Sequence, residues 1–153
     1  MEENKKTHIT RKDAREYAFA LLFAKTFSEE DDADCFYARE LENADIDFGT
    51  QLDYVHDVFF GVCDKRDEID ELISRYASGW TVSRLMKTTA AILRLSVYEM
   101  MAVSDVPKRV SLNEAVELAK KYDDDKAPAY INGVLNSISK TLPDKECDIE
   151  TDK

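Results

Sequence analysis

Two segments with helical periodicity, joined by a short turn, occupy the stretch from Ile92 to Tyr122. The first, ILRLSVYEM, carries apolar residues on all sides, which is typical of a helix at the centre of a bundle. The second is predicted to begin at Ser111, with Glu114 completing a capping box that satisfies free backbone amides. Between them lies Asp105-Val106-Pro107, where the proline disfavours helix at the residue before it. The pattern predicts a helical hairpin.

Amphipathic periodicity covers most of the remaining chain. Thr10 and Asp13 mark the start of a first helix, because their side chains can cap free backbone amides. Further helices are predicted over about 31–43, from Thr50 onward, over about 65–77, and from Pro128 to about 138. The core face of the helix that starts at Thr50 is predicted to consist of Leu52, Val55, Val58, Phe59 and Val62. The sequence has no strand pattern and no internal repeat. It therefore predicts an all-α fold of about seven helices.

Three phenylalanines form a second stripe on the first predicted helix. Phe19, Phe23 and Phe27 recur at a spacing of four residues, beside the main apolar stripe. The simpler interpretation places all three in the core. The alternative is an aromatic face presented elsewhere, and Phe23 is the residue for which we consider it.

Composition places the chain among water-soluble globular proteins. Its 153 residues are enough for one domain with a buried core, and only four glycines and three prolines favour long helices. No run approaches the roughly 18 apolar residues that cross a bilayer, and the first residues lack the apolar region of a secretory signal. Three widely spaced cysteines without a CxxC motif fit reduced thiols. We expect a cytoplasmic protein that makes no membrane contact.

The net charge of −11 is unevenly distributed. Residues 28–57 carry a net −10 and residues 143–153 a net −3, whereas residues 5–12 hold four positive charges and no negative one. An acidic protein is a poor nucleic-acid ligand, but a local basic arm keeps such binding open. An unimportant solvated tail fits the arm equally well. The predicted organisation is a flexible basic arm over 1–9, a helical domain over 10–142 and a disordered acidic tail over 143–153.

Catalytic and metal-binding patterns are missing from the sequence. His8 and His56 lack metal-ligand spacing to any cysteine, and no nucleophile-elbow, phosphate-loop or zinc-protease motif occurs. We therefore expect no enzymatic activity, no metal and no cofactor. Arg94 and Glu99 stand on the apolar helix, where an uncompensated charge is costly. A structural polar contact and a partner-binding role are equally open for them.

Four segments carry a resemblance to a known family. ILRLSVYEM, DVP, SLNEAVELAKKY and AYINGVL occur in the order and spacing of the NusB family of bacterial transcription antitermination factors, and the chain resembles that family over roughly residues 10–140. The resemblance implies an all-α fold of two packed helical subdomains without enzymatic activity. It also implies binding of boxA RNA in ribosomal RNA leader transcripts together with NusE, a small-subunit ribosomal protein. The complex would help RNA polymerase read through terminators.

The resemblance further implies which residues contact RNA. The family's arginine-rich motif maps onto Arg11, Lys12 and Arg15, with Asp13 where a basic residue is common. Lys5 and Lys6 are expected to compensate. The family's aromatic contacts correspond to Phe23 and Tyr130, with Asn132 as a further candidate for base recognition. Phosphate contacts by cations and stacking of unpaired bases on aromatic rings are how single-stranded RNA is bound.

Partner contacts are assigned to the apolar helix. Thr89 stands where the family usually has an acidic residue, and Arg94 and Glu99 are the other candidates for binding the protein partner. The alternative function is a helical protein-interaction module or a homodimer with little RNA binding of its own.

Overall fold

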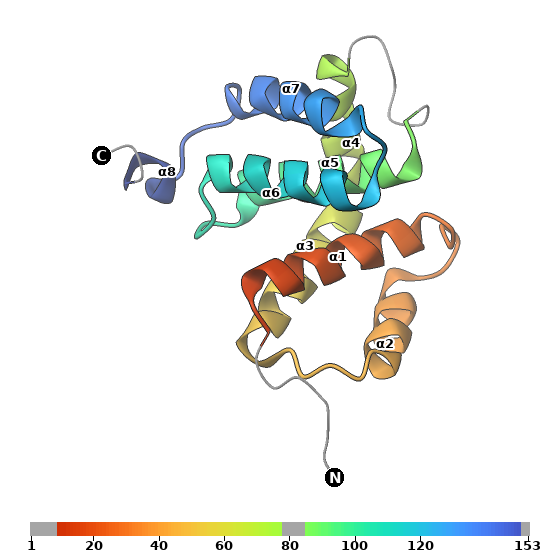
Figure 1. The fold of residues 1–153 in the computed structure, drawn as a ribbon. Coiled ribbons are helices and arrows are strands. Elements are labelled where there is room, and N and C mark those ends of the chain that lie inside the picture. Colours follow the sequence, from red (N-terminus) through yellow and green to blue (C-terminus); the bar gives the residue numbers. More distant parts are fainter. Residues whose placement is uncertain (1–8, 78–84, 151–153) are drawn as a thin grey trace. The chain divides into compact units, whose positions relative to one another are not determined.

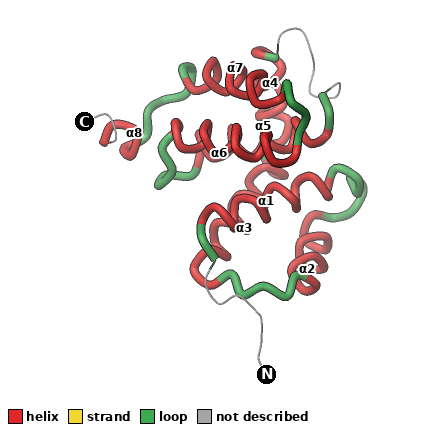
Figure 2. The backbone as a smooth tube through the Cα atoms, viewed as in Figure 1, coloured by secondary structure: helices red, strands yellow, loops and turns green. Residues whose placement is uncertain are grey.

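The computed structural model describes residues 9–77 and 85–150 of the chain. Among these residues it contains α-helices and one short 3-10 helix but no strand (Figures 1 and 2). The elements are α1 (Arg11–Lys25), α2 (Ala33–Asn43), η1 (Gly49–Gln51), α3 (Leu52–Asp64), α4 (Arg66–Tyr76), α5 (Lys87–Ala102), α6 (Lys108–Tyr122), α7 (Ala127–Ser139) and α8 (Glu146–Glu150). The all-α prediction is confirmed. None of the described helices is long and apolar enough to span a membrane.

The chain divides into two compact units, Met1–Cys63 and Asp64–Lys153. In the first unit, α1 begins with the predicted capping box. The Asp13 amide donates to Thr10 Oγ1 at 3.0 Å, and the Thr10 amide donates to Asp13 Oδ2 at 3.2 Å. This reciprocal pair satisfies two backbone amides that have no partner within the helix.

The core of the first unit is rich in aromatic rings. Phe36 of α2 stacks on Phe59 of α3 with ring centroids 5.9 Å apart, and both side chains are buried. Burial of such a side chain contributes about 1.5–3 kcal/mol. The predicted core face of α3 is wrong at one position, because Leu52 is 43% exposed while Tyr54 is buried.

In the second unit, α5 is the central helix. Every side chain from Thr89 to Met100 is buried, and α4, α6 and α7 all pack against it. Figure 1 shows α6 and α7 running beside α5. The prediction of a central helix followed by a proline-marked turn is confirmed.

The predicted start of α6 is wrong. The helix begins at Lys108 with Pro107 as its N-cap residue, so Ser111 lies inside it. Instead of capping the helix, the buried Ser111 hydroxyl donates to Glu99 Oε1 at 2.7 Å. The cap comes from Asp148, far along the chain, whose Oδ1 accepts from the Lys108 amide at 2.6 Å. A tertiary contact thus replaces the local one.

The first part of the acidic tail is structured, contrary to the expectation of disorder over residues 143–153. α8 lies there, and Lys145 just before it donates through Nζ to the carbonyl oxygens of Glu99 at 2.9 Å and Val103 at 2.7 Å. The Glu99 carbonyl also accepts from the amide of Val103, the C-cap residue of α5, at 3.1 Å, so Lys145 adds a second donor at this end of the helix. Burial lowers the pKa of Lys145. The segment therefore fastens the end of α5 and the start of α6.

Candidate functional sites

The basic end of α1 is held in place by α3 and η1. Arg11 Nε donates to Gln51 Oε1 at 2.7 Å, and its guanidinium carbon lies 4.3 Å from the centroid of the Tyr54 ring. A guanidinium over a ring face gains about 0.5–1 kcal/mol at such a partly exposed position. Lys12, the next residue, is exposed. Arg11 and Lys12 thus form a positively charged helix start that is positioned before any ligand arrives.

The other cations of the predicted RNA-binding motif have different positions. Arg15 is only 3% exposed, and its guanidinium carbon lies 5.8 Å from the Tyr54 ring. A phosphate contact needs an accessible guanidinium, so the burial of Arg15 favours a structural role. Lys5 and Lys6 lie outside the described residues, as do residues 1–8 of the arm predicted over 1–9.

Three phenylalanines of α1 and its C-terminal turn form a row of rings. The centroids of Phe19 and Phe23 are 6.2 Å apart, and those of Phe23 and Phe27 are 5.1 Å apart. Phe19 is buried, Phe23 is partly exposed and Phe27 is 63% exposed. Placing all three in the core is therefore wrong, and Phe27 is more accessible than Phe23. Phe27 lies two residues past the end of α1, where the helical spacing that would place it in the core no longer applies.

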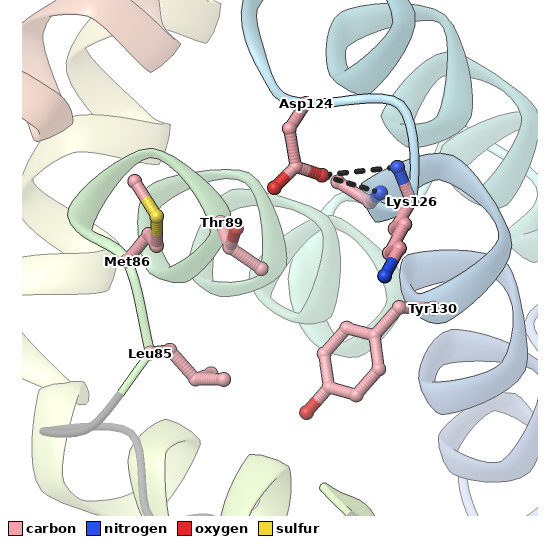
Figure 3. Close-up of a pocket in the computed structure, with 7 residues that line it drawn as sticks. Leu85, Met86, Thr89, Asp124, Lys126 and Tyr130 are labelled. Carbon is pink, nitrogen blue, oxygen red and sulfur yellow. Dashed lines mark hydrogen bonds between the residues drawn. The ribbon is translucent and has the colours of Figure 1, made fainter.

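Tyr130 of α7 lines a pocket of about 400 Å³ in the second unit, shown in Figure 3. The described residues around it are Leu85, Met86, Thr89, Asp124, Lys126, Ala127 and Tyr130. The Tyr130 hydroxyl donates to the Ala77 carbonyl oxygen at 3.3 Å, and burial raises the pKa of this phenol. The ring is thus anchored at its hydroxyl end.

Two charged residues, Asp124 and Lys126, line the mouth of this pocket. Asp124 Oδ1 accepts from the backbone amides of Lys126 and Ala127, each at 3.0 Å, and so caps the start of α7 (Figure 3). Lys126 is exposed, and Met86 is the most exposed large apolar residue beside it. Apolar walls and one aromatic ring suit a flat aromatic ligand, and Lys126 offers an ammonium group beside the Asp124 carboxylate. Sequence reasoning found Tyr130 but missed Met86 and Lys126, which have no distinctive local pattern.

Asn132 does not join Tyr130 in this pocket. The two residues are about 200° apart around the helix axis, since each residue turns an α-helix by about 100°. Asn132 is exposed and does not line the pocket. Asn132 therefore stays a separate candidate for base recognition, outside the Tyr130 pocket.

The three candidate partner-binding residues on α5 are buried. Arg94 forms a two-pronged ion pair with Asp70, with Nε–Oδ1 at 2.8 Å and Nη2–Oδ2 at 3.0 Å. Glu99 is fully buried and accepts from Ser111. The Thr89 hydroxyl donates to Asp123 Oδ2 at 2.6 Å. All three contacts lie within the second unit, which favours the structural alternative left open for Arg94 and Glu99.

Comparison with known proteins agrees with the sequence resemblance. The profile of the NusB family matches residues 12–140. The transcription antitermination protein NusB of Enterococcus faecalis is 40% identical over 146 residues, covering 90% of this chain and 94% of the relative. The protein of the same name from Levilactobacillus brevis is 42% identical over 128 residues, covering 83% and 90%. These relatives are named as antitermination proteins rather than enzymes, in agreement with the prediction of no enzymatic activity.

Solved structures show the same fold. NusB from T. maritima superimposes with a TM-score of 0.83 at 27% identity, covering 94% of this chain and 99% of that chain. A chain from a crystal structure of the antitermination factors NusB and NusE in complex with dsRNA gives a TM-score of 0.76 at 26% identity, covering 86% and 97%.

Proposed function

The chain belongs to the NusB family, and from that membership we propose that it is a transcription antitermination factor that binds boxA-type RNA together with NusE. Acting on nascent ribosomal RNA leaders, it helps RNA polymerase read through terminators, in the cytoplasm. The observation that carries the proposal is the family match along nearly all of the helical domain. The related chain crystallised with NusE and RNA supports the choice of partners.

The Tyr130 pocket is our candidate for an unpaired base. Sequence-specific RNA recognition uses splayed bases that stack on aromatic side chains. The Tyr130 ring, fixed through its hydroxyl to Ala77, offers a face for stacking, and Met86 and Leu85 supply apolar contact. Lys126 at the mouth supplies a cation for the adjoining phosphate. A base held in this way gains about 1–3 kcal/mol from stacking.

The start of α1 is our candidate for sequence-independent phosphate contacts. Arg11 is pre-positioned by Gln51 and Tyr54, so little freedom is lost when it meets a phosphate. Lys12 is exposed beside it, and Lys5 and Lys6 precede it in the sequence. Phe23 remains a stacking candidate, and we add the more exposed Phe27 to it. We do not propose direct contacts for Arg15, Thr89, Arg94 or Glu99, because their side chains are buried.

The net charge of −11 gives the partner a definite part in binding. Long-range repulsion between an acidic protein and RNA lowers the association rate and the affinity. A basic ribosomal protein supplies phosphate contacts of its own and offsets the negative charge. We therefore expect weak RNA binding by this chain alone and tight binding in the presence of NusE.

A titration of fluorescently labelled boxA-like RNA tests the proposal, with and without NusE. Tyr130→Ala is expected to weaken RNA binding by the complex with NusE about 5- to 150-fold, as loss of one stacked base predicts, while Tyr130→Phe retains most of the affinity. Tyr122→Ala is the matched control, because that tyrosine is exposed and lies outside the pocket. Absence of boxA binding even with NusE present would refute the proposed function.

The second candidate function is a protein-interaction module or homodimer with little RNA binding, and the exposed Phe27 ring favours it. Contiguous apolar patches on a surface often mark protein contacts, and the Phe27 ring lies 5.1 Å from the partly exposed Phe23 ring. Light scattering at several protein concentrations separates the candidates. A concentration-dependent dimer that Phe27→Ser abolishes, in a protein that fails to bind RNA, would replace the first proposal by the second.

A further inference from the structure

A second aromatic surface lies in the first unit, where α2 meets α3. Tyr37 of α2 and His56 and Phe60 of α3 form a three-ring cluster. Centroid distances are 5.4 Å between Tyr37 and His56, 4.9 Å between Tyr37 and Phe60 and 4.6 Å between His56 and Phe60. His56 is exposed and the other two rings are partly exposed. We name these three residues, together with the exposed Leu52, the α2–α3 aromatic face.

The α2–α3 aromatic face rests on a rigid base. The fully buried Phe59 ring lies 5.4 Å from Tyr37 and 5.0 Å from Phe60, between centroids. Leu52, His56 and Phe60 recur every four residues along α3, so they form one continuous strip on its exposed side. The rings are therefore held in one arrangement before any partner binds.

Carboxylates flank this strip. Asp53 and Asp57 each follow a member of it by one residue on α3, and both are exposed, as is Asp34 on α2. Between positions 28 and 57 the one Lys or Arg is Arg39, which pairs with Asp31 at 3.3 Å and lies over the Phe36 ring at 5.6 Å. The face thus has an apolar aromatic centre and a negative rim.

We propose that the α2–α3 aromatic face binds an arginine- and lysine-rich protein segment. Cations are attracted to the faces of aromatic rings, and their bonds to carboxylates are stronger than neutral hydrogen bonds. The negative rim steers a basic segment toward the rings and repels RNA phosphates and acidic lipids. The surface differs from the Tyr130 pocket and from the basic start of α1, so the inference goes beyond the proposed RNA binding.

The test uses the full chain and two labelled twelve-residue peptides in fluorescence anisotropy. One peptide alternates Arg or Lys with Leu, and the other has Glu at every cationic position. The basic peptide is expected to bind with an affinity that falls as salt rises, and the acidic peptide is expected not to bind. Equal binding of both peptides, or binding of neither, would overturn the proposal.

Charge variants locate the binding surface. Asp53→Asn combined with Asp57→Asn is expected to weaken binding of the basic peptide about tenfold, and His56→Lys, at an exposed position, is expected to abolish it. The matched control combines Asp67→Asn with Glu68→Gln, which removes two exposed carboxylates from the first turn of α4. Equal losses in the two double variants would show a nonspecific charge effect and defeat the proposal.

An RNA titration of the same variants separates this inference from the proposed function. Asp53→Asn combined with Asp57→Asn is expected to leave boxA RNA binding with NusE unchanged within about twofold. If the double variant lost boxA RNA binding with NusE to the same extent as it lost peptide binding, this face would not be a separate surface and the inference would fail. If the wild-type protein failed to bind boxA RNA with NusE, the proposed function would fail, but the peptide result would still support this inference.

Discussion

The charged side chains of α5 and those at the start of α1 are held in opposite ways. On α5, Arg94 and Glu99 are buried and bonded within their own unit. On α1, Arg11 and Lys12 keep partial or full exposure, although Arg11 is fixed by Gln51. α5 contains ILRLSVYEM, one of the segments that carry the family resemblance, yet its charged groups are bonded internally. A segment that identifies a family thus need not hold its binding residues.

The difference has a physical origin. A charge inside a helical bundle is tolerated only when it is paired with an opposite charge or hydrogen-bonded with good geometry. Such pairs fix the angle and register of neighbouring helices, as the Arg94–Asp70 pair does between α5 and α4. A charge at an exposed helix start keeps its hydration until a ligand displaces water, so it remains available for binding.

The largest expected effect is on the buried ion pair. Arg94→Ala is expected to lower the free energy of unfolding by about 2–3 kcal/mol, because among the described residues it leaves Asp70 with the longer 3.6 Å contact to Arg66 alone. Urea denaturation measured by circular dichroism gives the value. RNA affinity per folded molecule should stay unchanged if Arg94 is a scaffold residue.

The control for this variant is Arg75→Ala. Arg75 pairs with Glu71 at 3.4 Å on the exposed side of α4, and such surface pairs contribute about 0–0.5 kcal/mol. If Arg94→Ala retained wild-type stability but lost NusE binding, the comparison between α5 and α1 would be reversed, and Arg94 would be a partner contact.

Local patterns predicted the elements whose determinants are close in sequence. The α1 capping box uses Thr10 and Asp13, three residues apart, and α7 has Pro128 in its first turn as predicted. The start of α6 could not be predicted in this way. Its cap is Asp148, and Ser111 was free to turn inward toward Glu99. The same distant contacts gave order to a segment whose composition alone predicts disorder.

The candidate sites show the same difference between residues that local sequence predicts and residues that only tertiary packing brings together. Lys12 and Tyr130 were proposed as site residues through the resemblance, whereas most of the walls of the Tyr130 pocket come from the residues before α5 and from the turn before α7. Only the packing of α5 against α7 brings Met86 and Lys126 to one place. The inward orientation of Arg94 likewise depends on the position of Asp70 on another helix.

The second, smaller effect concerns Asp148 in the C-terminal segment, whose carboxylate caps the start of α6. Burial by itself raises the pKa of Asp148, but the amides of Lys145 and Lys108 outweigh burial, so the pKa lies below its ordinary value. The carboxylate therefore stabilises the fold above the ordinary pKa of about 3.9, and this contribution is lost as the pH falls through the lower folded value.

Asp148→Asn is accordingly expected to lower the free energy of unfolding by about 1–2 kcal/mol at pH 7 and to lose less stability than the wild type between pH 4 and pH 2. Thermal unfolding at a series of pH values measures both. Asp144→Asn is the control, because that carboxylate is 63% exposed in its pair with Lys108. Identical acid profiles for wild type and Asp148→Asn would exclude the capping role.

The smallest expected effect on stability is that of replacing Lys12, the exposed cation at the start of α1. Lys12→Gln is expected to leave stability within about 0.5 kcal/mol of wild type, because the side chain is exposed. RNA affinity in the presence of NusE should fall about 3- to 10-fold at low salt, and the slope of log affinity against log salt should drop by about one, as loss of one phosphate contact predicts. Lys120→Gln on α6 removes an equally exposed charge outside both candidate sites, and its salt slope should match the wild type. Equal slopes for both variants would mean that Lys12 acts only through net charge, and the start of α1 would then lose its claim to direct phosphate contact.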